Sequence, residues 1–308
     1  MKLLASLGAI IFSGVLSAAP LQNIVVFGDS LSDNGNLYEF MNHQLPPSPP
    51  YFEGRFSNGQ VWIEHLATSY FKDKTSAHFF DYAFGGAGVS EEEGDDEVLF
   101  TLRREINNYL KEHQDKADPN SLFVLWIGSN NYLAMPEEME KTVNTVNDGI
   151  KISIQRLVNK GAKHILVVNL PDLGSTPAAY EFDSVSTMTE FSKLHNQKLL
   201  ENFVAFKQEY PEVEWLFFDM NSILSDVITH PQAYGFNNVT EGCSNSVANQ
   251  TTKTSVLRMV AAVTPKAESN ACDGYLFFDL VHPTAPAHKM LAEKARKMLD
   301  EAQVEIGE

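Results

Sequence analysis

The chain has 308 residues, of which 44% are hydrophobic and 20% are charged. This balance is typical of a folded globular protein and too apolar for a disordered chain. Lysine and arginine number 23 against 40 aspartates and glutamates, so the net charge is −17. Because phosphates are bound mainly by lysine and arginine, we expect no nucleic-acid partner. The same charge disfavours adsorption to anionic lipid, so we expect peripheral membrane contact at most.

The first twenty residues have the layout of a secretory signal peptide. Lys2 gives a short basic start, residues 3–16 are almost entirely apolar, and three small residues follow at 17–19. The apolar run is short for a membrane span. We therefore predict that residues 1–18 are removed by cleavage near Ala18. Residues 19–308 would then form a single exported domain, extracellular or periplasmic. A buried N-terminal helix is the alternative.

Short apolar runs alternate with helical patterns along the rest of the chain. The runs predicted as strands are residues 23–27, 77–82, 121–127, 164–170 and 213–218. The predicted helices are residues 60–70, 97–112, 136–159, 184–208 and 283–303, the last opened by Pro283. Such alternation indicates βαβ units. We expect an α/β fold of the doubly wound, flavodoxin-like type, with a parallel sheet of about five strands and helices on both faces.

Three long irregular segments interrupt this pattern, and loops of this length usually carry function. Residues 44–58 include a proline-rich run followed by two aromatic residues, residues 90–96 are acidic, and residues 236–274 are polar. The acidic run lacks the spacing of an EF-hand loop, so we interpret it as a solvated loop rather than a calcium site.

The two cysteines, Cys243 and Cys272, both lie in the predicted exported part. An even count in an oxidising compartment predicts one disulfide that closes the loop between them, with two buried free thiols as the alternative. Zinc is disfavoured because neither cysteine has a partner at CxxC spacing. We expect the enclosed loop 243–272 to be mobile and protease-sensitive because it is polar and aperiodic.

A serine follows the first predicted strand. Residues 28–31 read Gly-Asp-Ser-Leu, which places Ser30 at the carboxyl end of a strand, where ligands bind in open α/β sheets. A serine is a weak nucleophile without a base and a group that orients the base. Asp279 and His282 have the spacing for a carboxylate to orient an imidazole that faces Ser30. Each motif is weak alone, because Ser30 could be a helix N-cap and His288 is a rival base.

Together with two further segments, these motifs resemble the GDSL, or SGNH, family of ester hydrolases. That family has four signature segments in a fixed order, and the string at residues 54–62 also resembles its lipolytic branch. The four matching segments are residues 28–31, 82–88, 128–131 and 279–282. The resemblance runs from Ile24 to about Leu299 and implies the SGNH-hydrolase type of fold.

The resemblance implies a role for each site residue. Ser30 is the nucleophile, His282 the general base, and Asp279 the group that orients the imidazole. The backbone N–H groups of Ser30 and Gly86 and the side-chain amide of Asn130 form the oxyanion hole. Neither a metal nor an organic cofactor is implied.

Two positions in these segments need comment. Gly86 is preferred over Gly85 as the donor because of its register in the second segment. The third segment usually reads Gly-x-Asn-Asp, whereas Asn131 stands in place of the aspartate. We expect activity to survive because Asn130 is the donor, which leaves open how Asn131 holds its loop.

The expected function is that of a secreted serine ester hydrolase acting on lipids. The resemblance is to bacterial lysophospholipase A and related phospholipases, with lysophospholipids or phospholipids as substrates. This branch includes glycerophospholipid–cholesterol acyltransferases, so acyl transfer to a sterol or another alcohol is a second activity that the resemblance allows. One alternative is a broad-specificity carboxylesterase or carbohydrate acetylesterase. From another class, the alternative is a catalytically silent binding or adhesion protein on the same fold.

Overall fold

A five-stranded parallel sheet forms the centre of the computed structural model, which describes residues 20–90, 100–244 and 272–307. The strand order is β2–β1–β3–β4–β5. In chain order the strands are β1 (Asn23–Gly28), β2 (Phe79–Asp81), β3 (Ser121–Trp126), β4 (His164–Val168) and β5 (Glu214–Phe218). This order is that of the flavodoxin-like doubly wound fold, so the predicted fold class is confirmed.

The central strand β3 shows why these segments are nearly continuous apolar runs. Its six residues are all buried, because helices cover both sides of the sheet. Phe123 packs edge-on against Tyr109 of one helical layer, with ring centroids 5.5 Å apart. The Trp126 ring packs edge-on against the Trp62 ring of the opposite layer, with centroids 5.6 Å apart. The core therefore lies on both faces of the sheet.

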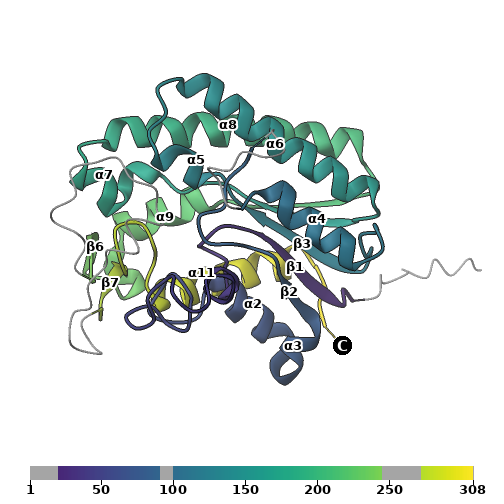
Figure 1. Ribbon diagram of the computed structural model, residues 1–308, viewed down its shortest axis with the longest axis horizontal. Coiled ribbons are helices and arrows are strands. Elements are labelled where there is room, and N and C mark those ends of the chain that lie inside the picture. The colour runs from purple at the N-terminus through teal and green to yellow at the C-terminus, as the bar shows by residue number, and fades with distance from the viewer. Residues whose placement is uncertain (1–19, 91–99, 245–271, 308) are drawn as a thin grey trace, which may run out of the picture.

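Two helical layers cover the sheet (Figure 1). One side carries α4 (Leu102–Glu112), α6 (Met139–Asn159) and α8 (Val185–Glu209), and the other carries α2 (Trp62–Phe71) and α11 (Ala285–Glu301). The short helices are α1 (Asn36–Phe40), α3 (Thr75–His78), α5 (Ser129–Leu133), α7 (Pro177–Glu181) and α9 (Met220–Thr229). Single 3-10 turns are η1 (Lys72–Lys74), η2 (Leu173–Ser175) and η3 (Pro231–Tyr234). Among the helices described, none combines the length and apolarity that crossing a bilayer requires.

Two predicted boundaries were wrong for local reasons. The strand predicted from residue 77 begins at Phe79, because Thr75–His78 form the short helix α3. The last helix was expected to open with Pro283, but α11 begins at Ala285. The N–H of Ala285 donates to the Asn58 side-chain oxygen at 2.7 Å, which satisfies an N–H group at the start of the helix.

The polar segment 236–274 was expected to be irregular, but its first described part contains a strand that pairs with a second strand just after the segment. There β6 (Asn238–Gly242) pairs in parallel with β7 (Tyr275–Phe277). Cys243 directly after β6 is joined to Cys272 by a disulfide, as predicted. The signal peptide 1–18, most of the acidic run 90–96 and most of the predicted mobile loop 243–272 lie outside the described residues, so those expectations remain predictions.

Candidate active site

Ser30, His282 and Asp279 lie in one hydrogen-bonded chain. The Oγ atom of Ser30 is 2.8 Å from Nε2 of His282, and Nδ1 of His282 is 2.7 Å from Oδ2 of Asp279. All three residues are buried. The structure thus brings together the three side chains that sequence analysis placed in one site, although Ser30 and His282 are 252 positions apart.

The end of β1 places Ser30 by close backbone packing. A Cβ atom at Gly28 would lie 2.5 Å from the Trp126 carbonyl oxygen of β3, so only glycine fits there. The N–H of Gly28 donates to Oε2 of Glu105 from α4 at 2.8 Å. The strand end is therefore fixed from two sides, two residues before Ser30.

The Asp279 carboxylate accepts four hydrogen bonds. Its Oδ2 accepts from Nδ1 of His282 and from the Tyr51 hydroxyl at 2.6 Å, and its Oδ1 accepts from the N–H groups of Val281 and His282 at 2.8 and 2.7 Å. Burial alone would raise the pKa of Asp279, but the His282 charge and these donors hold it below its ordinary value. An ionised Asp279 can only accept, so Nδ1 carries the proton and Nε2 faces Ser30 as an acceptor.

Two backbone N–H groups near Ser30 are available to a ligand. The N–H of Gly85 is taken, because it donates to Oδ2 of Asp33 at 2.7 Å. The N–H groups of Gly86 and of Ser30 have no partner among the described residues. Gly86 has φ of 78°, a left-handed conformation that favours glycine. This pattern fits the preference for Gly86 over Gly85.

Both asparagines of the third segment tie it to the second. Nδ2 of Asn130 donates to the Ala87 carbonyl oxygen at 2.8 Å, which leaves its other amide hydrogen for a ligand. Asn131 accepts from the Val89 N–H through Oδ1 and donates to the Val89 carbonyl oxygen through Nδ2, both at 2.9 Å. Asn131 therefore holds the loop by donating and accepting at once, which an ionised aspartate cannot do.

An apolar pocket adjoins this hydrogen-bonded chain. Ser30, Asn130 and His282 are among its polar lining residues. The rest of the lining is mainly apolar and includes Leu133, Leu173, Met220, Leu224, Met290 and Leu291. An ester whose carbonyl carbon lies at Ser30 can place a hydrocarbon chain against these side chains.

Comparison with known proteins gives the family. The family model described as "GDSL-like Lipase/Acylhydrolase" matches residues 24–295. The chain belongs to this family.

Its relatives in the GDSL family include bacterial proteins. "Phosphatidylcholine-sterol acyltransferase" from Aeromonas hydrophila is 32% identical over 92% of each chain. "Secreted effector protein SseJ" from Salmonella typhimurium is 28% identical over 90% of this chain, which spans only 63% of that protein. Among solved structures, a carbohydrate acetylesterase from Sinorhizobium meliloti matches 92% of this chain and 98% of its own, at 12% identity and a TM-score of 0.47.

Two other buried histidines of this GDSL family member are core residues. Nδ1 of His288 accepts the Trp62 N–H at 3.1 Å, and burial lowers the pKa of His288 to about 3. His195 contacts the Tyr132 hydroxyl at 2.8 Å, and burial lowers its pKa to about 3 as well. His288, the rival base, is therefore neutral and bound to backbone, whereas His282 contacts Ser30.

A group of buried carboxyls near Ser30 was not predicted from the sequence. Burial raises the pKa of Asp29 to about 7, despite the Leu31 N–H bond and the His282 charge, and raises that of Asp33 to about 6. Burial also raises the pKa values of Asp81 and Glu105 well above the ordinary range. Nothing in the local sequence distinguishes these carboxyls from exposed ones.

Proposed function

We propose that this GDSL family member is an exported serine ester hydrolase that releases fatty acids from lysophospholipids and phospholipids. The observation that carries the proposal is the 2.8 Å contact between Ser30 Oγ and His282 Nε2 beside an apolar pocket. Ester hydrolysis needs a nucleophile, a base and a site that holds the acyl group, and these features can supply all three.

The reaction passes through an acyl-enzyme. Ser30 Oγ attacks the ester carbonyl carbon while its proton moves to Nε2 of His282, and Asp279 stabilises the imidazolium. When the tetrahedral intermediate collapses, His282 gives the proton to the leaving glycerol oxygen. Water then attacks the acyl-Ser30 ester with His282 again as base, which releases the fatty acid and restores the serine.

Three donors serve the oxyanion of the intermediate in this mechanism. They are the N–H groups of Ser30 and Gly86 and the free amide hydrogen of Asn130. Two of them have no partner among the described residues, and the third belongs to an amide already fixed on Ala87. Donors that are oriented before the reaction stabilise developing charge without reorganisation.

A lipid substrate is supported by the pocket and by a relative. An acetyl group is too small to use a wall built from α5, α9 and α11 side chains, whereas a fatty acyl chain would bury hydrocarbon along it. The relative from Aeromonas hydrophila is named for an acyltransferase that acts on phosphatidylcholine. Both observations favour a lipid over an acetylated sugar.

The test compares substrates with one purified enzyme. Fatty-acid release from palmitoyl-lysophosphatidylcholine and dipalmitoyl-phosphatidylcholine is measured beside hydrolysis of p-nitrophenyl acetate and acetylated xylose, with Ser30→Ala as the control. The proposal predicts the highest kcat/KM on the long-chain lipids and no turnover by Ser30→Ala.

Each other outcome has a definite meaning. Equal or better turnover of short esters would remove the lipid assignment and favour a general carboxylesterase. Preference for acetylated xylose would favour a carbohydrate acetylesterase. No turnover at all, and no labelling of Ser30 by a fluorophosphonate, would favour a catalytically silent protein.

We propose acyl transfer to a sterol as a second activity, because the Aeromonas hydrophila relative is named for that acceptor. Transfer requires only that the sterol 3-hydroxyl replace water at the acyl-enzyme, with His282 accepting its proton. Adding cholesterol to the phospholipid assay should yield cholesteryl ester and reduce free fatty acid by the same amount. Unchanged fatty-acid release without ester would rule out this activity.

We also propose that residues 1–18 direct export. The basic start, the apolar run and the small residues support this assignment, and one relative is named as a secreted effector. N-terminal sequencing of protein recovered outside the cytoplasm should begin near residue 19. Retention in the cytoplasm with Met1 intact would contradict export.

A further inference from the structure

We propose that Tyr51 is a positioning residue, which holds the Asp279 carboxylate and, through it, the His282 imidazole for proton transfer from Ser30. This inference rests on the ester hydrolysis proposed above. Tyr51 lies in the loop between α1 and α2, directly after the proline-rich run, and is 228 positions from Asp279.

The contact is short and is shared with the base. The Tyr51 hydroxyl donates to Oδ2 of Asp279 at 2.6 Å, and the same oxygen accepts Nδ1–H of His282 at 2.7 Å. Tyr51 is only 1% exposed, so water has little access to replace the hydroxyl. Burial, followed by the Asp279 charge, raises the pKa of Tyr51, so the hydroxyl keeps its proton and remains a donor.

The ring of Tyr51 is fixed before any substrate binds. It packs edge-on against Phe278, with centroids 5.0 Å apart, and against Phe56 at 6.1 Å. Its backbone is held as well, because Ser48 Oγ donates to the Tyr51 carbonyl oxygen at 2.6 Å. A donor held this firmly loses little freedom when it orients a carboxylate.

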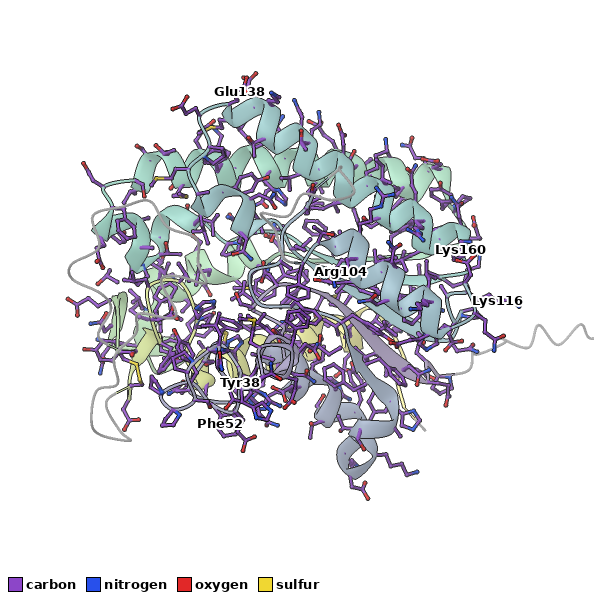
Figure 2. All side chains as sticks on the ribbon, in the orientation of Figure 1. Tyr38, Phe52, Arg104, Lys116, Glu138 and Lys160 are labelled. Atoms are coloured by element: carbon purple, nitrogen blue, oxygen red, sulfur yellow. A yellow bond between two sulfur atoms is a disulfide. The ribbon has the colours of Figure 1, made fainter. Side chains whose placement is uncertain are left out.

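The loop around Tyr51 contacts the base-bearing loop at further points. Ser57 Oγ donates to the Pro283 carbonyl oxygen at 2.8 Å, and Asn58 Oδ1 accepts the Ala285 N–H at 2.7 Å. Segment 51–58 therefore binds the chain on both sides of the catalytic histidine. Figure 2 shows Phe52, from this segment, on the side of the molecule opposite Glu138. The hydrogen bonds of Ser57 and Asn58 give the string at 54–62 a structural role, because they hold the chain next to the fourth signature segment.

Removing one donor has a predictable electrostatic effect. Without the Tyr51 hydroxyl, Oδ2 of Asp279 keeps more negative charge for the Nδ1–H of His282. The protonated imidazole is then favoured, so the enzyme loses its base at a higher pH. The carboxylate is also less well oriented, so the rate on the pH plateau falls. Substrate binding is unaffected, because Tyr51 does not line the pocket.

The test variant is Tyr51→Phe, which keeps the ring and removes the hydroxyl. Tyr109→Phe is the matched control, since Tyr109 is equally buried and its hydroxyl accepts the Asp118 N–H at 3.1 Å. The rate of fluorophosphonate labelling of Ser30, and kcat and KM on a short-chain ester, are measured against pH. For Tyr51→Phe the acidic limb of the pH–rate profile should move up by roughly half to one pH unit. The rate on the plateau of that profile should be about 3- to 30-fold lower, and KM should be unchanged. Tyr109→Phe should leave all three unchanged.

A second comparison shows whether Tyr51 acts through Asp279. In an Asp279→Asn background, Tyr51→Phe should change the labelling rate less than about twofold, because coupled residues give non-additive effects. If Tyr51→Phe lowers the labelling rate by the same factor in the Asp279→Asn background as in the wild type, the two residues act independently and the proposal is overturned. The proposal would also be overturned if Tyr51→Phe lowered the rate but left the acidic limb of the pH–rate profile in place, because loss of packing alone gives that result.

An activity-independent measurement separates this proposal from the proposed function. The Nδ1–H proton of His282 should give a low-field NMR resonance, and Tyr51→Phe should move it further downfield as Oδ2 becomes a stronger acceptor. An unmoved resonance would contradict the positioning role. Failure of the wild-type protein to react with fluorophosphonate would instead count against hydrolysis at Ser30, and the resonance would still decide the role of Tyr51.

Discussion

Asn130 is held by Ala87: its Nδ2 atom donates to the Ala87 carbonyl oxygen at 2.8 Å, so the third signature segment is bound to the loop that carries Gly86. One hydrogen of the Asn130 amide is donated to the Ala87 carbonyl oxygen, and the other can be donated to the oxyanion. The side chain is thus oriented by the protein rather than by the substrate, which is the condition for effective stabilisation of charge in a transition state.

Asn130→Ala should therefore lower kcat by about 10²- to 10³-fold, as loss of one oxyanion donor does in enzymes that use an oxyanion hole. KM should change little, because the donor acts on the intermediate more than on the bound ester. Steady-state kinetics on the preferred ester, with thermal unfolding to verify the fold, gives the result. A fall in kcat of less than tenfold would show that Asn130 is not an oxyanion donor.

Asn131→Asp should destabilise the fold, although the family usually has aspartate at this position. The amide donates to the Val89 carbonyl oxygen, and a carboxylate oxygen placed there would face that oxygen without a hydrogen. Urea denaturation at pH 7 should show a loss of about 1–3 kcal/mol, the cost of an unpaired buried acceptor. Unchanged or increased stability would show that the loop is held in another way.

Asp29→Asn should change how stability depends on pH. The pKa of Asp29 is raised by burial to about 7, whereas the ordinary value is 3.8. Between these values the folded state retains a proton that the unfolded state has released, so stability falls as pH rises through this window and the loss is complete above about 7.

Asparagine does not titrate, so the variant lacks this loss. From pH 5 to 7.5, the unfolding free energy of the wild type should fall relative to Asp29→Asn by on the order of 2–3 kcal/mol. Urea titrations of both proteins across this range measure the difference. A difference that stays constant with pH would contradict the burial effect assigned to Asp29.

Met290→Trp should shorten the acyl chains that the enzyme accepts. Met290 lines the apolar pocket from α11 and is half-buried, so a larger ring can fill the pocket without entering the main core. Release of palmitate from lysophosphatidylcholine should fall at least about tenfold, while hydrolysis of p-nitrophenyl acetate changes little.

Met298→Trp is the matched control for this prediction. It lies on the same helix, is also half-buried and does not line the pocket. It should leave the ratio of long-chain to short-chain activity as in the wild type. Equal loss of both activities in Met290→Trp would show damage to the fold instead of a blocked acyl site.

The sheet could be predicted because its signals are local, and the hydrogen-bonded chain at Ser30 because its segments resemble those of a known family. Buried parallel strands are short apolar runs, and β3 and β4 were found at nearly their true positions. Ser30 lies just after such a strand, where the open α/β fold concentrates ligand-binding residues, whereas His282 lies in the loop before α11. That Asp279 and His282 join Ser30 was predicted from the resemblance to the GDSL family, because each motif is weak when taken alone.

The rest depends on contacts between distant segments that leave no local pattern. β6 has the polar sequence NVTEG and forms a strand because β7 pairs with it. The contact of Tyr51 with Asp279 depends on how a proline-rich loop packs against a segment 228 positions further along the chain. The raised pKa values of Asp29 and Glu105 depend on burial, which a single carboxyl in a sequence does not reveal.

Hydrolysis depends on Ser30 being a nucleophile that His282 activates, and covalent labelling measures that activation without any substrate. Intact-mass measurement after brief exposure to a long-chain fluorophosphonate should show one adduct, mapped to the peptide that contains Ser30. His282→Ala should slow its formation by about 10³-fold or more, and Ser30→Ala should abolish it. An unlabelled wild-type protein, an adduct on another residue, or labelling at an unchanged rate in His282→Ala would show that Ser30 is not a nucleophile activated by His282.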